Sequence, residues 1–369
     1  MKDVAIVGAG MAGASLAAEI SGEASVVLIE AEAHPGYHST GRSAAFWSES
    51  YGGPLIQPLT SASGRFLAGP PPDFADEPFL AARGALHIAD SAGAARLDAV
   101  EREFAGAVPF VRIGADDLRT RIAGLGAQWE RALWEPSCAD IDVARLHSAY
   151  LKKARRNGAE LVTDARLAKA DRSGRGWRIE TARGTIDAKM VVDAAGAWAD
   201  EVAGLCGIEP LGIRPYRRTL AQLRIDPPVP AALPLVIDAL GRFYFKPESG
   251  GRLWLSPHDE TACDPADCAP EEYDVALAVD RLERAVDWRV ERVERSWAGL
   301  RSFAPDRLPV YGYEPGRSDF FWFAGQGGFG IQTAPAAAKL AAALLLGRCP
   351  DPLAEGINPA PYDPGRFRN

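Results

Sequence analysis

Three glycines and a glutamate near the start of the chain have the types and spacing of a diphosphate-binding site. Gly8, Gly10 and Gly13 follow a short apolar run, and Glu30 ends the next apolar run, SVVLIE. Gly8 suits a tight turn, Gly10 lets backbone amides approach a pyrophosphate, and Gly13 lets a helix pack closely on a strand. The dipole of that helix stabilises the pyrophosphate, and Glu30 accepts hydrogen bonds from ribose hydroxyls. This pattern predicts a strand, turn, helix and strand that bind a dinucleotide.

Two later segments have the same order of a buried strand, a turn of small residues and a helix. They are MVVDAAGAWA at 190–199 and DFFWFAGQGGFGIQT at 319–333. Strands that alternate with helices in this way predict an α/β (α+β) fold. Between these segments, 241–257 shows two alternating runs around PESGG, which predicts a β-hairpin.

The same pattern divides the chain into two expected domains. A discontinuous, Rossmann-like dinucleotide-binding domain is expected over 1–80, 137–210 and 298–369. The less regular segments 81–136 and 211–297, which are rich in proline and aromatic residues, predict an inserted substrate-binding domain with a mainly antiparallel sheet.

Composition and charge exclude several classes of protein. The 369 residues carry a net charge of −8, which argues against nucleic acid as a partner because phosphate neutralisation needs clustered Lys and Arg. The five cysteines form no CxxC pair, so no metal site is expected. The start of the chain lacks the features of a secretion signal. The longest apolar stretch, 334–347, is interrupted by Lys339 and is too short to span a bilayer, so a cytoplasmic protein without a transmembrane segment is expected.

Four motifs in order resemble the D-amino-acid oxidase/glycine oxidase superfamily of FAD enzymes. They are GAGMAG, VVDAAGAWA, GLRSFAPDRLPVYG and GQGGFGIQT. Within it, PGYHSTGRSAA, WAGLRSF and QGGFGIQT are most similar to the bacterial D-arginine dehydrogenases, and the similarity covers nearly the whole chain. The resemblance implies FAD, and three glycine-rich strand ends suit so long a ligand. Because no Cys or His lies in a motif for covalent flavin attachment, we expect FAD to be bound non-covalently.

The resemblance also implies which residues hold the cofactor. The segment 39–46 is expected to follow the pyrophosphate, ribityl chain and flavin ring. The segment 328–332 is expected to approach the pyrimidine side, where the N-terminus of the next helix stabilises negative charge on the reduced ring. The expected cofactor residues are Gly8, Gly10, Ala12, Gly13, Glu30, Ala31, Ser39, Thr40, Gly41, Arg42, Ser43, Ala44, Ala45, Phe46, Leu167, Ala195, Gly196, Gly328, Phe329, Gly330, Ile331 and Gln332.

For the substrate, the resemblance implies a carboxylate clamp at Arg301, in the segment GLRSF. A guanidinium offers two parallel donors, which fix both the position and the rotation of a carboxylate. The other expected substrate-site residues are Tyr51, Tyr244, Arg218, Phe46 and Gln332. Alternation along RFYFKP would point Tyr244 away from its two Phe neighbours. Arg218 stays in competition with Arg217, because a slip of one residue would exchange their sides of the strand.

The sequence departs from the D-arginine enzymes near this site. Ala85 stands where those enzymes carry a carboxylate for the substrate guanidinium, and Phe46 stands where they carry a histidine. Burying a guanidinium without a partner costs free energy on the order of kilocalories per mole. Ala85, Phe46 and Trp47 therefore favour a more apolar or aromatic substrate side chain. Glu49 would restore a preference for a cationic side chain if it pointed inward.

The expected reaction is oxidative deamination of a D-amino acid. A hydride passes from the substrate Cα to flavin N5, and the imine hydrolyses to a 2-oxo acid and ammonia. Two alternatives use the same scaffold: an oxidase of secondary amines such as sarcosine or cyclic imino acids, and a 2-hydroxy-acid dehydrogenase. A third is a FAD-binding accessory or redox-sensing protein without turnover, which has no use for a carboxylate clamp. The expected partners are a small amino-acid substrate and an electron acceptor, either a quinone or O2.

Overall fold

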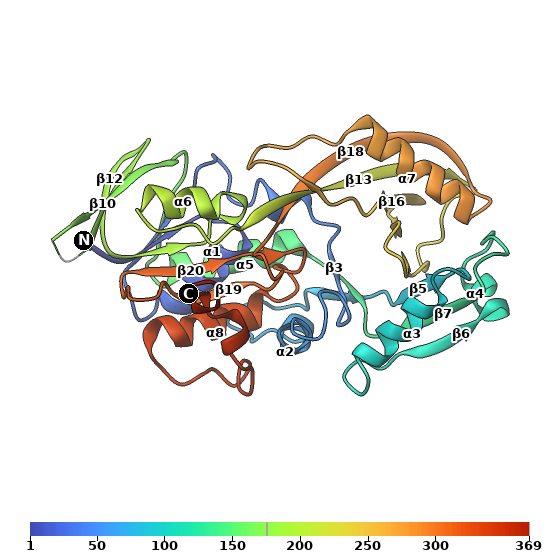
Figure 1. Cartoon of the computed structure of the whole chain (residues 1–369), viewed down its shortest axis with the longest axis horizontal. Coiled ribbons are helices and arrows are strands. Elements are labelled where there is room, and N and C mark those ends of the chain that lie inside the picture. The colour runs from blue at the N-terminus through green and yellow to red at the C-terminus, as the bar shows by residue number, and fades with distance from the viewer. Residues whose placement is uncertain (175, 369) are drawn as a thin grey trace.

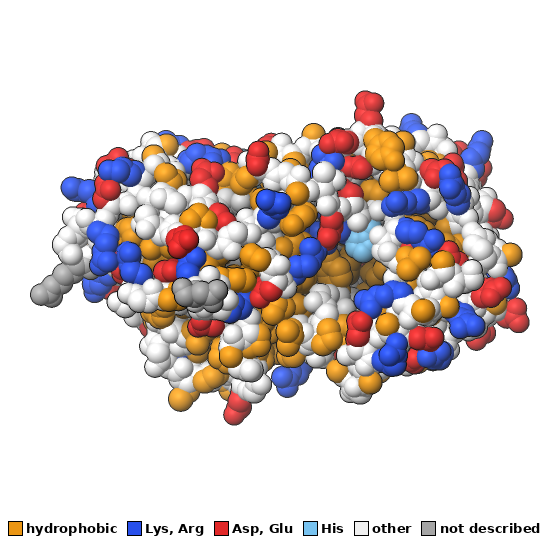
Figure 2. Space-filling view, viewed as in Figure 1, with side chains coloured by type: hydrophobic (Ala, Val, Ile, Leu, Met, Phe, Trp, Pro, Cys, Tyr) orange, Lys and Arg blue, Asp and Glu red, His pale blue; other side chains and the backbone are white. Residues whose placement is uncertain are grey.

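The computed structural model describes residues 1–174 and 176–368. In Figure 1 a half built on a parallel sheet with helices lies on the left, with both termini, and a half built on a large antiparallel sheet lies on the right. This arrangement confirms the predicted fold class. On the face shown in Figure 2, positive and negative side chains are interspersed at both ends of the molecule. No helix within the described residues has the length and apolar character needed to cross a membrane.

Five parallel strands form the centre of the first sheet. Their order is β20, β12, β1, β2, β9, and an antiparallel strand, β19, and the pair β10–β11 extend it. The central strands are apolar on both sides because helices cover both faces. The bounds are β1 Lys2–Val7, β2 Val26–Ile29, β9 Glu160–Val162, β10 Leu167–Ser173, β11 Gly176–Thr181, β12 Gly184–Asp193, β19 Val310–Tyr313 and β20 Phe320–Ala324.

Helices enclose two layers of core against this sheet. On one face Ile6, Leu28 and Phe321 pack against Leu16 and Leu340 of the covering helices. The helices of that layer are α1 Met11–Ile20, α2 Gln57–Ala68, α5 Val143–Arg156 and α8 Ala334–Leu346. On the opposite face lies α6, Ala199–Leu205. The predicted first strand, helix and second strand are therefore confirmed as β1, α1 and β2.

The second sheet has ten strands in the order β21-β18-β13-β16-β15-β14-β5-β7-β6, with β17 paired to β13. Most pairs are antiparallel, and β15 with β16 confirms the predicted hairpin. The bounds are β5 Ala85–Ala89, β6 Val111–Gly114, β7 Arg131–Glu135, β13 Arg214–Asp226, β14 Leu235–Asp238, β15 Tyr244–Glu248, β16 Arg252–Ser256, β17 Thr261–Ala262, β18 Arg289–Phe303 and β21 Gln326–Gly327. The accompanying helices are α3 Ala94–Glu103, α4 Ala115–Arg121 and α7 Glu272–Ala285.

A small sheet and four short turns complete the fold. The sheet has the order β3, β8, β4, and it carries the start of the segment 46–51. Its bounds are β3 Phe46–Trp47, β4 Leu80–Ala82 and β8 Ala139–Ile141. The 3₁₀ turns are η1 Ser39–Arg42, η2 Gly196–Trp198, η3 Ala360–Tyr362 and η4 Pro364–Phe367.

The long pair β13–β18 of the antiparallel sheet extends from the centre of the molecule into the right half (Figure 1). Its register pairs Arg218 with Gly299 and Tyr216 with Arg301. Because side chains alternate along a strand, both arginines project from the same face of the pair. The boundary expected between residues 297 and 298 falls inside β18, so one continuous strand belongs to both expected domains.

Candidate functional site

The glycine turn after β1 brings backbone into contact with backbone. Gly8 has φ +99°, and a Cβ there would lie 2.5 Å from the carbonyl oxygen of Ala194, at the end of β12. A Cβ on Gly13 would lie 1.9 Å from the carbonyl oxygen of Gly8. These contacts leave no room for side chains, so α1 begins directly against the sheet edge. The N-terminus of α1, which has no acidic residue in its first turn, therefore faces the same edge as the end of β12.

Glu30 lies at the end of β2 and is buried. Its Oε2 accepts the backbone N–H of Ala9 at 2.9 Å, and its Oε1 accepts that of Glu32 at 3.0 Å. Each carboxylate oxygen has a second lone pair, and Glu30 lines the pocket. The two amides thus hold the carboxylate in place while leaving it able to accept ribose hydroxyls.

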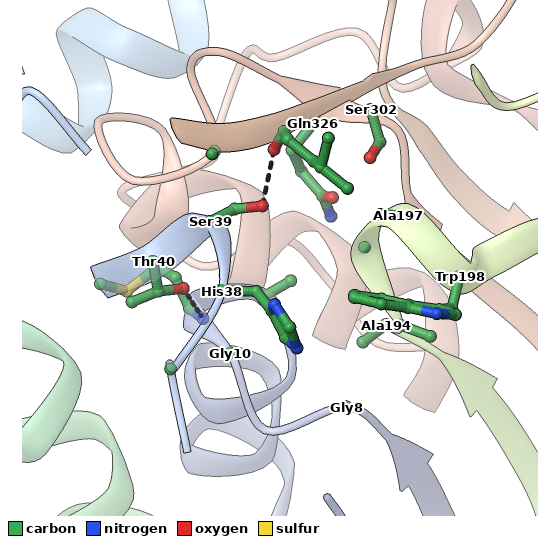
Figure 3. A pocket seen from close by; sticks show the side chains of 18 of the residues that line it. Gly8, Gly10, His38, Ser39, Thr40, Ala194, Ala197, Trp198, Ser302 and Gln326 are labelled. Carbon is green, nitrogen blue, oxygen red and sulfur yellow. Dashed lines mark hydrogen bonds between the residues drawn. The ribbon is translucent and has the colours of Figure 1, made fainter. Parts of the chain in front are cut away.

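The segment that follows is tied to both halves of the fold. Thr40 Oγ1 accepts the backbone N–H of Met11 at 2.9 Å, and Ser39 Oγ donates to the carbonyl of Leu300 at 2.6 Å, in β18. Figure 3 shows these two bonds and places Ser39 and Thr40 opposite Trp198 across the pocket. The hydroxyls therefore fix the path of η1 along the pocket wall.

One continuous pocket runs from Glu30 at one end to Arg301 at the other. It passes the N-terminus of α1, the η1 segment that two hydroxyls tie in place, and the ends of strands β1, β2 and β12. An extended ligand with ribose, diphosphate and a planar ring fits this sequence of groups, with its ring end near Arg301.

The structure places most of the expected cofactor and substrate residues on the wall of this pocket. Those that line it are Gly8, Gly10, Ala12, Glu30, Ala31, Ser39, Thr40, Arg42, Ser43, Ala44, Phe46, Tyr51, Leu167, Ala195, Gly196, Arg218, Tyr244, Arg301, Gly328, Gly330 and Ile331. Five expected residues are not among the lining residues: Gly13, Gly41, Ala45, Phe329 and Gln332.

Those five residues have other contacts. Gly13 packs on Gly8, and Gly41 packs against the carbonyl of residue 36. Ala45 has a left-handed backbone, with φ 57°. Phe329 is buried in a small apolar cluster behind the pocket wall, with its ring centroid 6.3 Å from that of Tyr51. All described hydrogen bonds of the Gln332 side chain go to protein groups.

Arg301 is held between a phenol and a carboxylate. Its Nη1 donates to Tyr51 Oη at 2.7 Å, and its Nη2 donates to Glu260. Burial lowers the pKa of Arg301, but Tyr51 and Glu260 outweigh burial and raise this pKa above its ordinary value. The guanidinium therefore stays charged inside the protein. Because Tyr51 Oη accepts from Arg301, its own proton is free to donate into the pocket.

The register of β13 resolves the choice between two adjacent arginines. Arg218 lines the pocket and is buried, and its Nε donates to the carbonyl of Asp259 at 2.7 Å. Arg217 faces the other side, where it pairs with Glu271 and Asp274 of the α7 region. Burial, together with the charge of Arg301, lowers the pKa of Arg218. Two guanidinium groups thus face the same end of the pocket.

Three aromatic rings surround this end of the pocket. The ring centroid of Phe46 lies 5.4 Å from that of Tyr51 and 5.9 Å from that of Tyr244. Phe243 and Phe245 belong to the core on the opposite side of β15, as alternation predicted. Burial raises the pKa of Tyr244, so its phenol stays neutral.

The other residues expected to set specificity point elsewhere. Trp47 is buried, and its Nε1 donates to the carbonyl of Thr60 in α2 at 3.1 Å. Glu49 accepts a hydrogen bond from Ser61 of α2, so its carboxylate is directed to that helix. Ala85 is buried in the apolar cluster beneath Tyr244. Of the substituted positions, Phe46 is the one that lines the pocket.

Two buried polar side chains anchor the turn that carries Phe46 and Tyr51. Glu135, at the end of β7, accepts Ser48 Oγ at 3.0 Å, Ser50 Oγ at 2.7 Å and the backbone N–H of Glu49 at 2.7 Å. His87 Nε2 also lies 2.9 Å from Oε2 of Glu135.

Gln332 holds the same turn from the other side. Its Oε1 accepts the N–H of Ser48 at 3.2 Å, and its Nε2 donates to the carbonyl of Tyr51 at 3.1 Å. This geometry favours a positioning role for Gln332 and Glu135, each acting through the turn.

Replacing Glu135 with alanine is expected to lower the free energy of unfolding by about 3–5 kcal/mol. The carboxylate is fully buried, so its removal leaves two serine hydroxyls, an amide and His87 without their partner. Urea denaturation measures the effect. Glu130→Ala, which removes an exposed carboxylate nearby in the sequence, is the control. Equal effects of the two substitutions would contradict the anchoring role.

Trp198 lines the pocket without having been expected from the sequence, whereas His38 lies in the segment PGYHSTGRSAA, which the resemblance placed along the cofactor. The rings of His38 and Trp198 pack on each other at the pocket wall with centroids 4.6 Å apart (Figure 3), and His38 Nε2 lies 3.0 Å from Glu32 Oε1. Trp198 lies two residues after Gly196 in the motif AGAWA. Its position beside this strand-end glycine could have identified it as a pocket residue. Glu135 follows an ordinary strand, and nothing in its neighbours indicates that it lies under the site.

Comparison with known proteins identifies the family of the chain. A model of the family DAO, described as FAD dependent oxidoreductase, matches residues 3–344. Glycine oxidase of Pseudomonas aeruginosa is 30% identical over 268 residues, which cover 69% of this chain and 68% of that protein.

Two solved structures share the fold. Glycine oxidase from Geobacillus kaustophilus has a TM-score of 0.85 at 23% identity, with 98% of each chain covered. Iminodiacetate oxidase from Chelativorans sp. BNC1 has a TM-score of 0.78 at 22% identity, again with 98% of each chain covered. With the family model matching most of its length and the pocket suited to the dinucleotide, the chain belongs to the DAO family of FAD-dependent oxidoreductases and binds FAD.

Proposed function

We propose that this protein oxidises the CH–NH bond of a D-amino acid with an apolar side chain, releasing a 2-oxo acid and ammonia. The observation that carries the proposal is the buried, charged Arg301 at the ring end of the pocket, with Tyr51 bound to it. A substrate carboxylate supplies the anion that this pair lacks on the pocket side. The D configuration is supported by the resemblance of the motifs to D-amino-acid enzymes.

The pocket walls support the apolar side chain. Among the described residues, the lining carboxylates Glu30, Glu32 and Glu201 are grouped with the ADP-binding segments, whereas Phe46 and Tyr244 line the end near Arg301. A cationic side chain such as that of D-arginine has no lining carboxylate to pair with there. Phe46 and Tyr244 also exclude water from the reacting carbon.

In the proposed reaction the chain's own residues bind and orient the substrate. Arg301 and Tyr51 hold the carboxylate, Arg218 adds a second cation, and the aromatic rings set the position of Cα. Bound FAD supplies the acceptor for the hydride that leaves Cα of the neutral amine. The imine that remains takes up water to give the 2-oxo acid and ammonia.

A secondary-amine oxidase is the alternative function. It is supported by the fold shared with iminodiacetate oxidase, whose name states a secondary amine as substrate. Anaerobic mixing of the holoenzyme with D- and L-amino acids, sarcosine, iminodiacetate and 2-hydroxy acids separates the functions by loss of flavin absorbance. We expect apolar D-amino acids to reduce the flavin. Reduction by sarcosine or iminodiacetate alone would favour the alternative, and reduction by hydroxy acids alone would refute both.

We expect FAD to be released when the protein is precipitated with acid. The five cysteines are Cys138, Cys206, Cys263, Cys268 and Cys349, and none is among the residues that line the pocket. His38 lines it with its ring packed on Trp198 and its Nε2 paired with Glu32. Absorbance at visible wavelengths should appear in the supernatant, and yellow colour retained in the washed pellet would show covalent attachment.

A further inference from the structure

The carboxylate of Glu260 lies among three guanidinium groups. It accepts a hydrogen bond from Arg301 Nη2, and two from Arg307 Nη2 at 2.9 and 3.0 Å. Its Oε1 also lies 3.5 Å from Arg218 Nη2. Arg218 and Arg301 line the pocket, whereas Glu260 is not among the lining residues. Glu260 therefore contacts the two pocket arginines from outside the pocket.

The loops that make this contact have an unusual backbone. Arg307 has φ 67°, and His258, two residues before Glu260, has φ 59°. They are two of the four non-glycine residues with positive φ in the described part of the chain. Such conformations cost on the order of 1–3 kcal/mol and persist only where the surroundings impose them. The surrounding fold thus imposes the approach of Glu260 to the arginines.

The charges around Glu260 do not cancel. Three guanidinium groups share this carboxylate. Asp259, whose oxygens accept the N–H and the hydroxyl of Thr219 at 2.7 and 3.0 Å, adds a second carboxylate 3.8 Å from Arg218 Nε. Nε of Arg301 is buried and has no hydrogen-bond partner. Three guanidinium groups therefore face two carboxylates, which leaves an excess of positive charge for a second anion on the pocket side.

We propose that Glu260 is a positioning residue for substrate recognition. It holds Arg301 and Arg218 in the orientation that receives a substrate carboxylate, and it stays bound to them when the substrate enters. The inference rests on the proposed function, because it assumes a carboxylate substrate. Glu260 shares its charge among three cations, so the clamp keeps a positive excess that a substrate carboxylate fills.

The test compares Glu260→Ala and Glu260→Gln in the holoenzyme. Benzoate, an aromatic carboxylate with no amine to oxidise, is titrated while the flavin absorbance is recorded, and kcat and KM are measured with the best substrate. We expect Glu260→Ala to raise the Kd for benzoate and the KM by about tenfold, with kcat within about threefold of wild type. Glu260→Gln keeps an acceptor for the arginines and should restore part of the loss.

The matched control is Glu271→Ala, which removes one of the carboxylates that pair with Arg217 on the opposite side of the same strand and should leave benzoate binding unchanged. Wild-type or tighter benzoate binding by both Glu260 variants would overturn the inference, since Glu260 would then be irrelevant to the clamp or in competition with the ligand. A wild-type holoenzyme that neither binds benzoate nor is reduced by any amino acid would overturn the proposed function itself. Glutamine is nearly isosteric with glutamate, so the Kd for benzoate of Glu260→Gln tests the inference even if the alanine variant fails to fold.

Discussion

Replacing Arg301 with alanine is expected to lower kcat/KM by a factor of about a hundred to ten thousand. The guanidinium is the cation that Tyr51 and Glu260 orient at the ring end of the pocket. Each charge-assisted hydrogen bond to a substrate carboxylate contributes about 1.5–3 kcal/mol, and a pair of them fixes the rotation of the substrate about its Cα. Losing both the binding energy and the orientation affects KM and kcat together. Steady-state kinetics with the best substrate of the panel measures the loss.

Two further variants make this experiment specific to Arg301. Arg301→Lys keeps the charge but not the planar pair of donors, so we expect it to recover only part of the activity. Arg217→Ala removes a neighbouring arginine that pairs with Glu271 and Asp274 outside the pocket, and its kinetics should stay close to wild type. Each variant is purified with FAD, and its flavin spectrum shows that the cofactor site is intact. Near wild-type kinetics in Arg301→Ala would remove this residue from the substrate site.

Replacing Gly13 with valine is expected to weaken FAD binding by about a hundredfold or more. Its Cβ alone would lie 1.9 Å from the carbonyl oxygen of Gly8, so α1 has to move away from the turn after β1. Such overpacking against backbone costs on the order of 1–3 kcal/mol or more. The displaced helix N-terminus then no longer faces the pyrophosphate. The dissociation constant for FAD, measured by titrating the apoprotein and following flavin fluorescence, reports the effect.

The control for Gly13 is another helical glycine with free space around it. Gly204 lies in α6, and a Cβ there would meet no atom within 4 Å. Gly204→Ala is therefore expected to bind FAD like wild type and to be about 0.5–1 kcal/mol more stable. Equal FAD affinities of the Gly13 and Gly204 variants would refute the role of close packing at Gly13. Circular dichroism shows whether the Gly13 variant keeps its helices, which separates loss of the site from loss of the fold.

The nucleotide-binding half could be predicted because its constraints are local. Gly8 and Gly13 stand where neighbouring backbone leaves no room for a Cβ, and Glu30 ends the strand that follows. Steric demands of this kind act over a few residues, so they leave a recognisable spacing. The hairpin β15–β16 could be predicted for the same reason, because its turn and its alternation lie within one short segment.

The substrate end of the pocket could be predicted only in part, because contacts between distant segments determine which side chains face it. Arg217 and Arg218 are neighbours with the same chemistry, and only the register of β13 against β18 decides which one faces the pocket. Phe46 and Trp47 are adjacent aromatic residues, and the packing of α2 decides that Trp47 points away. Gln332 was expected beside the cofactor, but its side chain bonds to Ser48, Tyr51 and Thr60.

The sequence by itself determined the fold class and the FAD fingerprint, because both are encoded by residue types at short, fixed spacing, whereas the carboxylate clamp at Arg301 was implied by the resemblance and stays a prediction. Only the tertiary structure decided how the pocket is supported and charged. Glu135 and Glu260 come from a strand end and a loop without a recognisable motif, and they meet Glu49 and Arg301 across long stretches of chain. A buried carboxylate acquires its role from the donors that folding brings around it, and the order of residues near it carries no record of those donors.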